Sequence, residues 1–350
     1  MLLQENVPLA PLTTFRIGGP ARFFVEAKST NEVQEAVAFS HARKLPLFLL
    51  GGGSNVLVAD QGWPGLALKI AIPGIERRSS DEDGYAIFDV GAGESWDRFV
   101  SHAVMAQCSG VECLSGIPGS VGGTPVQNVG AYGQEVSETI DAVQVLDLQT
   151  AQLRELCREA CGFSYRSSIF NTSERGRFII LSVTYALTPG GAPRLSYADL
   201  KRHFHGRETS PNLAETREAV RHIRALKGML IVPGEPDCRS AGSFFKNPII
   251  APEKHEELQR RAAAKGLALP IYPALEQNKK VSAAWLVEHS GFARGFGFGE
   301  VGISTRHSLA IVNRGQATAA QVLALKDQIQ QRVADIWDVC LETEPVLVGF

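Results

Sequence analysis

The chain lacks the features that mark membrane-spanning and secreted proteins. No apolar run in its 350 residues approaches the ~20 residues that a helix needs to cross a bilayer. The first residues, Met1 to Pro8, do not combine a basic segment with a following apolar segment, as a secretory signal would. We therefore expect a cytoplasmic protein with no membrane partner.

An excess of charge of one sign is also missing. The 35 Lys and Arg residues nearly balance the 37 Asp and Glu residues, which gives a formal net charge of −2. Such a balance supplies no general attraction to nucleic acid or to an anionic lipid surface. We expect no nucleic-acid partner, and any anionic ligand must be held by local groups.

Cysteines are few and scattered. The six lie at positions 108, 113, 157, 161, 238 and 340. The only close pair, Cys157 and Cys161, has no matching second pair and no nearby histidines of the kind that complete a zinc site. We expect free thiols and no metal.

The length and the pattern of the chain indicate more than one domain. At 44% hydrophobic residues, 350 residues exceed the size at which a single core usually stops growing. Strand patterns dominate the first half and helix patterns the second, after a break at 189–193. This order predicts an α+β protein in which a cofactor domain precedes a domain that covers it.

Hydrophobic periodicity and capping residues predict the individual elements. A Ser29–Glu32 capping box predicts the start of the first helix, and Asn212 the cap of a later one. The predicted strands are 23–27, 45–50, 56–59, 142–147, 178–185 and 341–350. The other predicted helices are 96–107, 252–265, 280–290 and 318–338.

The segment from Gly116 to Gly133 is the most informative part of the chain, because six of its 18 residues are glycine. Glycine adopts positive φ without strain and lets main-chain N–H groups approach a ligand closely. The glycines are interrupted by Pro118, Pro125 and the amide pair Gln127 and Asn128. The segment predicts main chain wrapped around a flat or anionic cofactor.

A second glycine-rich loop, Gly51 to Asn55, follows a predicted strand. Its N–H groups, with Ser54 and Asn55, can bind a pyrophosphate, although a plain β-turn fits the loop alone equally well. The chain leaves this loop as a strand, which excludes the Rossmann strand-to-helix arrangement. Two such loops together favour a dinucleotide.

Three residues are candidates for chemistry, each with an ordinary alternative. Arg166 can hold a carboxylate with two hydrogen bonds, or be a structural arginine. Ser243 can donate a proton, or cap a turn, and Glu344 can be a simple solvated carboxylate. Their spacing alone does not bring them together.

Taken together, six segments in order resemble the MurB family of flavin-dependent UDP-N-acetylenolpyruvoylglucosamine reductases, and they cover nearly the whole chain. These segments are 13–21, 50–57, 116–133, 164–170, 241–248 and 341–344. The resemblance implies an α+β chain with an FAD-binding fold of the vanillyl-alcohol-oxidase/PCMH type, followed by a smaller α/β substrate-binding domain. The implied divisions are 1–70 and 71–205 for FAD, 206–340 for substrate, and 341–350 as a strand returning to the active site.

The resemblance also implies roles for residues. Arg166, Ser243 and Glu344 match the family's catalytic positions, and Tyr197, Lys227 and Asn247 its substrate contacts, with Tyr197 typical of the family's first type. The implied FAD-binding residues are Gly51, Gly52, Gly53, Ser54, Asn55, Gly116, Ile117, Pro118, Gly119, Gly122, Gly123, Thr124, Gln127, Asn128, Gly130 and Ala131.

The implied reaction reduces UDP-N-acetylglucosamine enolpyruvate to UDP-N-acetylmuramate for peptidoglycan synthesis, with FAD as cofactor and NADPH as co-substrate, in a monomer. Two alternatives stay open. One is a flavin oxidase of small alcohols or sugars, although neither glycine-rich loop holds the histidine or cysteine that commonly tethers flavin in such enzymes. The other is a nucleotide-binding module without catalysis.

Overall fold

The computed structural model describes residues 1–78, 84–273 and 277–350. These residues form two compact units. Unit 1 comprises 1–7, 21–53 and 63–226, and unit 2 comprises 8–20, 54–62 and 227–350. The chain therefore passes between the units several times, and Gly53 and Ser54 fall on either side of one passage. The four-part division expected from the resemblance stays a prediction.

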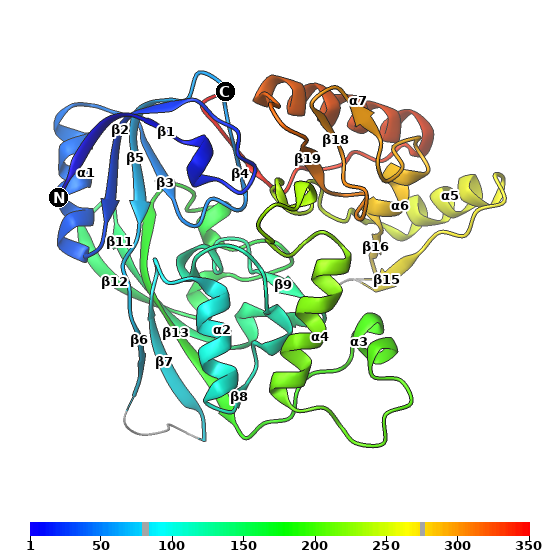
Figure 1. Ribbon diagram of the computed structural model, residues 1–350, viewed down its shortest axis with the longest axis horizontal. Helices are drawn as coiled ribbons and strands as arrows, with labels where there is room; N and C mark the ends of the chain where they lie inside the picture. Colours follow the sequence, from blue (N-terminus) through cyan, green and yellow to red (C-terminus); the bar gives the residue numbers. More distant parts are fainter. Residues whose placement is uncertain (79–83, 274–276) are drawn as a thin grey trace. The chain divides into compact units, whose positions relative to one another are not determined.

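The first sheet of unit 1 has the order β1-β2-β5-β3 (Figure 1). Its strands are β1 (Leu3–Pro8), β2 (Pro20–Ala27), β5 (Trp63–Ile70) and β3 (Leu47–Leu50). Strand β5 is parallel to both β2 and β3. Helix α1 (Thr30–Ala42) begins as predicted, since the Ser29 side chain accepts the Glu32 N–H, and its Val33 and Ala36 are fully buried.

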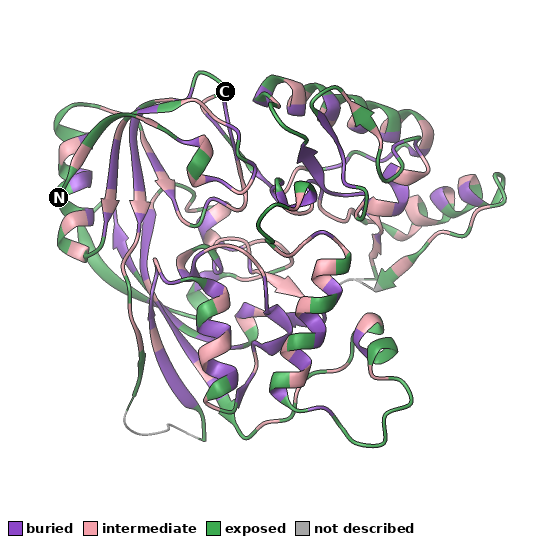
Figure 2. Ribbon diagram, viewed as in Figure 1, coloured by how far each residue is buried: buried purple, intermediate pink, exposed green. Residues whose placement is uncertain are grey.

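The second sheet of unit 1 has the order β12-β11-β13-β7-β6, and β8 also pairs with β13. Its strands are β6 (Ile75–Arg77), β7 (Ala86–Gly91), β8 (Cys108–Ser109), β11 (Ile140–Asp147), β12 (Gln152–Cys157) and β13 (Phe178–Pro189). All its pairs are antiparallel. Helix α2 (Trp96–Met105) packs Phe99 against Tyr185 of β13, with ring centroids 4.7 Å apart, within the buried core drawn in purple in Figure 2.

Unit 1 also includes the glycine-rich segment and helices α3 (Ala198–His203) and α4 (Leu213–Leu226). A short hairpin of β9 (Gly130–Ala131) and β10 (Gln134–Glu135) begins in the segment and ends just after it. Helices α3 and α4 share a small apolar cluster with Tyr132. Asn212 caps α4 as predicted, because its Oδ1 accepts the Glu215 N–H at 2.9 Å.

The described residues of unit 2 form three small sheets and three α-helices. The sheets are β14-β16-β15, β17-β18-β19 and β20-β4. Their strands are β4 (Val56–Val58), β14 (Ile249–Ile250), β15 (Ile271–Pro273), β16 (Lys279–Val281), β17 (Gly297–Phe298), β18 (Val301–Ile303), β19 (Ile311–Asn313) and β20 (Val346–Val348). The helices are α5 (Pro252–Ala263), α6 (Ala283–Glu288) and α7 (Ala319–Trp337). The apolar stripe predicted for α7 forms much of the core, with Val322, Leu325, Ile329 and Val333 fully buried.

Strands β2 and β13 are three and four residues longer than predicted, and two further predictions are wrong in type over part of their length. The predicted helix 280–290 begins only at Ala283, because Lys279–Val281 pairs with two strands and the Ser282 side chain caps the helix that follows. The predicted strand 341–350 is confined to Val346–Val348, which pairs in parallel with β4. Strands are also more frequent in the second half than the helix patterns indicated.

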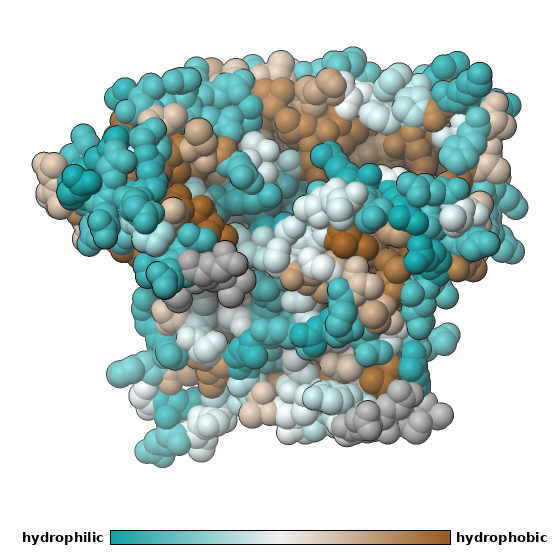
Figure 3. All heavy atoms as spheres, turned by 180° about the vertical axis from the view of Figure 1, so that it is seen from behind, coloured by the Kyte–Doolittle hydropathy of each residue, from teal (hydrophilic) through white to brown (hydrophobic). Residues whose placement is uncertain are grey.

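All six cysteines are free thiols, as predicted. No group of three or more His, Cys, Asp or Glu side chains within residues 1–78, 84–273 and 277–350 is arranged to hold a metal ion. The helices in those ranges include none with both the length and the apolar character needed to cross a membrane. The face in Figure 3 shows hydrophobic residues in separate patches among hydrophilic ones, an ordinary pattern for a folded protein.

Candidate functional site

Two glycine-rich loops meet main chain to main chain in unit 1. A Cβ added to Gly52 would lie 2.5 Å from the Gly119 Cα, and one added to Gly51 would lie 2.8 Å from the Ser120 Oγ. Gly116 and Gly119 also have φ values of 72° and 130°, which favour glycine. The two loops of the sequence prediction therefore pack directly against each other in one contact region, the loop patch.

The Ser120 hydroxyl lies in the loop patch. It is buried, and among the described residues none provides a hydrogen-bond partner for its Oγ. A buried hydroxyl without a partner is unfavourable, so a polar ligand atom would improve its surroundings. A hydroxyl beside main-chain N–H groups suits the oxygen-rich and nitrogen-rich parts of FAD, and the residues present therefore fit that cofactor.

Sequence reasoning missed Ser120 as a site residue. The sequence prediction included Gly119 and Gly122, on either side of Ser120, because they are glycines. The available signal was a hydroxyl within the same turn, but only the structure shows that this hydroxyl is buried and unpaired.

Two predicted cofactor residues use their side chains within the protein. The Thr124 hydroxyl donates to the Val121 carbonyl at 2.8 Å and lies 2.8 Å from the Tyr185 hydroxyl. The Asn128 side chain donates to Glu135 and to the Ser164 carbonyl. These contacts favour structural roles for both side chains.

An ionic cluster fixes the start of the glycine-rich segment. The Asp97 carboxylate accepts the Gly116 N–H at 2.6 Å and two hydrogen bonds from Arg217, at 2.6 and 2.9 Å. Arg221 adds a hydrogen bond at 2.8 Å, and the Arg224 Nε donates to the Gly116 carbonyl at 3.1 Å. Both polar groups of Gly116 are therefore held, by α2 and by α4.

The charge state of Asp97 follows from these contacts. Burial by itself raises the pKa of the carboxyl, but hydrogen bonds from Arg217 and Gly116, together with the positive charges of Arg217 and Arg221, outweigh it. The pKa of Asp97 is therefore below its ordinary value, and the carboxylate is ionised at neutral pH.

Arg166 lies at the tip of a tight turn in unit 1. Ser164 and Ser167 exchange main-chain hydrogen bonds of 3.0 and 3.1 Å across the turn. The Arg166 Nη2 donates to the Gly130 carbonyl at 2.9 Å. The structure thus brings Arg166 to the glycine-rich segment, which its sequence position did not require.

Ser243 and Glu344 are brought together in unit 2. The Glu344 N–H donates to the Phe244 carbonyl at 2.9 Å, and Phe245 pairs with Thr343 in an antiparallel bridge. The rings of Phe244 and Phe245 are buried in the core of the unit, whereas Ser243 is half-buried. Ser243 and Glu344 therefore lie on neighbouring segments that pair through their main chains beside two buried aromatic residues.

Asn55 joins the same region of unit 2. Its Nδ2 donates to the Glu344 carbonyl at 3.3 Å, and its own carbonyl accepts the Val346 N–H at 2.9 Å. The predicted Gly51–Asn55 loop is thus divided, since Gly51 to Gly53 belong to unit 1.

The predicted substrate contacts have different environments. Tyr197 precedes α3 and is 43% exposed, with its ring edge-on to Tyr132 at 5.3 Å. Lys227 follows the end of α4 and is half-buried. The Asn247 Oδ1 accepts the Ala283 N–H at 2.9 Å, so this side chain also supports the start of α6.

Comparison with known proteins agrees with both units. Residues 21–156 match an FAD binding domain, and residues 235–348 match the C-terminal domain of UDP-N-acetylenolpyruvoylglucosamine reductase. Proteins named UDP-N-acetylenolpyruvoylglucosamine reductase from Thermobifida fusca and Streptomyces coelicolor are 42% and 44% identical to the chain. Each alignment covers 99% of this chain, and 98% and 90% of the respective relative.

A solved structure gives the same result. The crystal structure of UDP-N-acetylenolpyruvylglucosamine reductase (MurB) from Thermus caldophilus is similar with a TM-score of 0.67 and 27% identity, over 99% of this chain and 100% of that one. These findings confirm the predicted order of an FAD-binding domain followed by a second domain. With full-length relatives above 40% identity, the chain belongs to the UDP-N-acetylenolpyruvoylglucosamine reductase (MurB) family.

Proposed function

We propose that the chain is an FAD-dependent oxidoreductase that reduces UDP-N-acetylglucosamine enolpyruvate to UDP-N-acetylmuramate, with NADPH as the electron source. Membership of the family supports the reaction class. The observation that carries the cofactor assignment is the buried, unpaired Ser120 hydroxyl between two loops that only glycine permits to meet.

The residues that would hold FAD are in the loops 51–53 and 116–123. The N–H groups of Gly116, Val121, Gly122 and Gly123 donate within the protein. The Ser120 hydroxyl and other main-chain N–H groups of the two loops would supply hydrogen bonds to FAD without a charged side chain. FAD bound there would supply the hydride chemistry, with NADPH as the source of electrons and the enolpyruvyl group as the acceptor. The Asp97 cluster keeps Gly116 in place for this binding.

Arg166 is proposed to hold the substrate carboxylate. The planar guanidinium can donate two parallel hydrogen bonds to it. When negative charge develops on the carbon beside the carboxylate, these bonds strengthen, an effect of about 3–4 kcal/mol per donor in comparable sites. Arg166 is thus the residue that stabilises the enolate-like intermediate of the substrate.

Ser243 is proposed to donate a proton to that carbon. A serine hydroxyl is a weak acid, so the step needs a strongly basic acceptor and a group that restores the serine proton. Glu344, on the neighbouring segment, is proposed to orient Arg166 or to stand protonated beside the carboxylate. Tyr197, Lys227 and Asn247 are proposed to contact the rest of the substrate.

The remaining assignments follow from the reaction. The product is a precursor of peptidoglycan, so the protein would act in the cytoplasm and contribute to cell wall biogenesis. Through the cell wall it would also contribute to cell shape, the cell cycle and cell division. NADPH and the nucleotide-sugar would bind one after the other in the same pocket, as a two-step reaction permits. The enzyme would act as a monomer.

The test is stopped-flow absorbance of the purified protein loaded with FAD. Mixing with NADPH is expected to bleach the flavin band, and adding UDP-N-acetylglucosamine enolpyruvate is expected to restore it. Ser243→Ala is expected to keep the bleaching and to lose most of the restoration. Equal loss of both half-reactions would contradict the role of Ser243.

The same experiment distinguishes the alternatives. Restoration by oxygen alone, with no effect of the enolpyruvyl substrate, would favour an oxidase of small alcohols or sugars. A colourless protein that takes up no FAD would favour a nucleotide-binding module without catalysis.

A further inference from the structure

The main chain at Arg166 has an unusual conformation. Its φ is 55°, in the left-handed region that side chains with a Cβ rarely adopt. Such a conformation persists only where surrounding contacts determine it, and it occurs often at functional sites. The contacts that fix the turn therefore decide where the guanidinium points.

Two asparagine side chains supply these contacts from outside the turn. The Asn128 Nδ2 donates to the Ser164 carbonyl at 3.0 Å, and the Asn171 Nδ2 donates to the Arg166 carbonyl at 3.1 Å. Each amide thus holds one of the two carbonyls that flank Tyr165 and Arg166. Main-chain pairing between Ser164 and Ser167 closes the turn but leaves the Arg166 carbonyl to Asn171.

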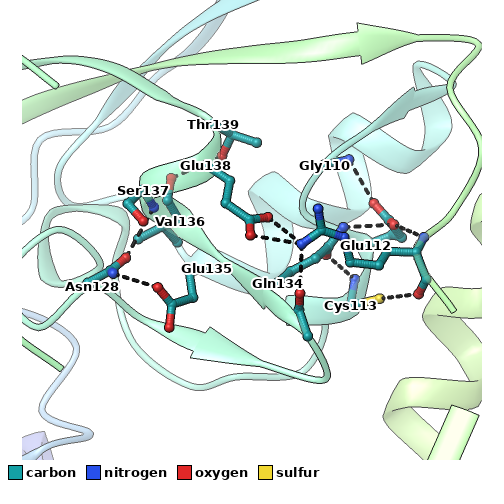
Figure 4. A network of polar contacts seen from close by, with 12 residues as sticks. Gly110, Glu112, Cys113, Asn128, Gln134, Glu135, Val136, Ser137, Glu138 and Thr139 are labelled. Atoms are coloured by element: carbon teal, nitrogen blue, oxygen red, sulfur yellow. Dashed lines mark hydrogen bonds and ion pairs between the residues drawn. The ribbon is translucent and has the colours of Figure 1, made fainter. Parts of the chain in front are cut away.

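Asn128 is itself held in one orientation (Figure 4). It is only 1% exposed, its Nδ2 also donates to the Glu135 carboxylate at 2.8 Å, and its Oδ1 accepts the Ser137 N–H at 3.1 Å. A carboxylate can only accept and an N–H can only donate, so a flipped amide would lose both contacts. The donor that reaches Ser164 is therefore fixed.

Asn171 is held in the same manner. Its Oδ1 accepts the Ser168 N–H at 2.9 Å, which leaves the Nδ2 directed at the Arg166 carbonyl. The side-chain end of Arg166 is fixed by the Gly130 carbonyl, two residues after Asn128. The 128–130 segment thus contacts both the start of the turn, at the Ser164 carbonyl, and the guanidinium of Arg166.

We infer that Asn128 and Asn171 are positioning residues for Arg166, acting through the 164–167 turn rather than by contact with a ligand. This inference rests on the proposed function, in which Arg166 holds the substrate carboxylate. It also assigns Asn128 a task that its place among glycines did not indicate.

The main test is Asn171→Asp. Aspartate keeps the acceptor for Ser168 but replaces the donor to the Arg166 carbonyl with a second acceptor. Since a misplacement of ~1 Å can cost about 100-fold in rate, the restoration of the flavin band by substrate is expected to slow by up to about 100-fold. Bleaching by NADPH and the affinity for FAD are expected to change little. Asn128→Asp is expected to show a larger loss in the same step; if it does not retain FAD, Asn171→Asp alone decides.

The decisive readout is a double-mutant cycle with Arg166→Ala. If Asn171 acts through Arg166, adding Asn171→Asp to Arg166→Ala slows the substrate step no further. An equal loss in both backgrounds, an unchanged rate in Asn171→Asp, or an equal loss of both half-reactions would each overturn the inference. Absence of the substrate step in the unmodified protein would instead overturn the proposed function.

Ser40→Ala is the matched control. The Ser40 hydroxyl is also buried in unit 1 and donates to one main-chain carbonyl, that of Leu45, at 2.9 Å. Removing this hydroxyl breaks one hydrogen bond to a main-chain carbonyl, as Asn171→Asp does, but leaves the contacts of the 164–167 turn unchanged. Both half-reactions are expected to be unchanged, and a loss here like that of Asn171→Asp would show that the rate follows general stability.

Discussion

In unit 1, polar side chains hold the main chain of the candidate site. Asp97 and Arg224 bind the two polar groups of Gly116, and two asparagines bind the turn of Arg166. In unit 2, main-chain pairing over buried aromatic rings holds the segments of Ser243 and Glu344. Glycine-rich main chain has few side chains to pack, so it must be fixed by hydrogen bonds, whereas the Phe244–Phe245 segment is fixed by burial.

Removing a buried ring from unit 2 is expected to have the largest effect. Phe244 is fully buried, and Phe244→Ala is expected to lower the free energy of unfolding by about 3–5 kcal/mol. Urea unfolding followed by circular dichroism measures this. Phe350→Ala, at a ring that is 57% exposed, serves as control and is expected to change little. Similar costs for the two would show that burial does not fix the Ser243 segment.

Removing the charge of Asp97 tests the polar support of unit 1. Asp97→Asn leaves Arg217 and Arg221 without their anionic partner and is expected to cost about 2–3 kcal/mol at pH 7. Glu138→Gln breaks an exposed pair with Arg194, and this control is expected to cost less than about 1 kcal/mol.

The effect of Asp97→Asn is expected to depend on pH. The folded-state pKa of Asp97 lies below the unfolded value of about 3.9, so its contribution to stability is complete above that value. The contribution is lost as the pH falls through the folded pKa. Urea unfolding at pH 7, 5 and 3 is therefore expected to show a constant difference between the two proteins at pH 7 and 5, and a smaller one at pH 3. A difference that does not shrink in acid would contradict the ionic role.

A methyl group between the two glycine-rich loops tests their contact. Gly52→Ala is expected to cost about 1–3 kcal/mol, because its Cβ meets main-chain atoms of Gly119 that cannot move independently. The protein is also expected to retain less FAD, measured as flavin absorbance per protein. Gly315→Ala, whose Cβ meets only the end of the Glu300 side chain, is expected to be nearly neutral.

Removing the unpaired Ser120 hydroxyl is expected to have the smallest effect. The change should not harm the stability of the FAD-free protein, but it should weaken the binding of FAD. Ser120→Ala is expected to leave the FAD-free protein as stable or slightly more stable, since the hydroxyl has no partner among the described residues. It is expected to weaken FAD binding by roughly fivefold, for a hydrogen bond of about 1 kcal/mol. Melting temperature and fluorescence titration with FAD measure the two quantities. An FAD-free protein destabilised by the change would show that the hydroxyl serves the fold.

Much of the local structure was predictable because its causes lie close together in the chain. Ser29 and Asn212 cap the helices that their positions predict, and the apolar stripe of α7 is buried as its periodicity requires. The helix predicted for 280–290 begins late because 279–281 pairs as a strand with β14 and β15, and β14 lies about 30 residues earlier in the chain. The assignments of Arg166, Ser243 and Glu344 came from the resemblance to a family and stay predictions until tested.

The sequence by itself determined where glycine permits close main-chain contact, where helices begin, and to which family the chain is similar. Only the tertiary structure decided which groups those glycines let meet, that Ser120 is buried without a partner, and that Asp97 and the two asparagines support the site. The physical reason is that φ preferences and caps depend on neighbouring residues, whereas burial and hydrogen-bond partners depend on segments tens of residues apart.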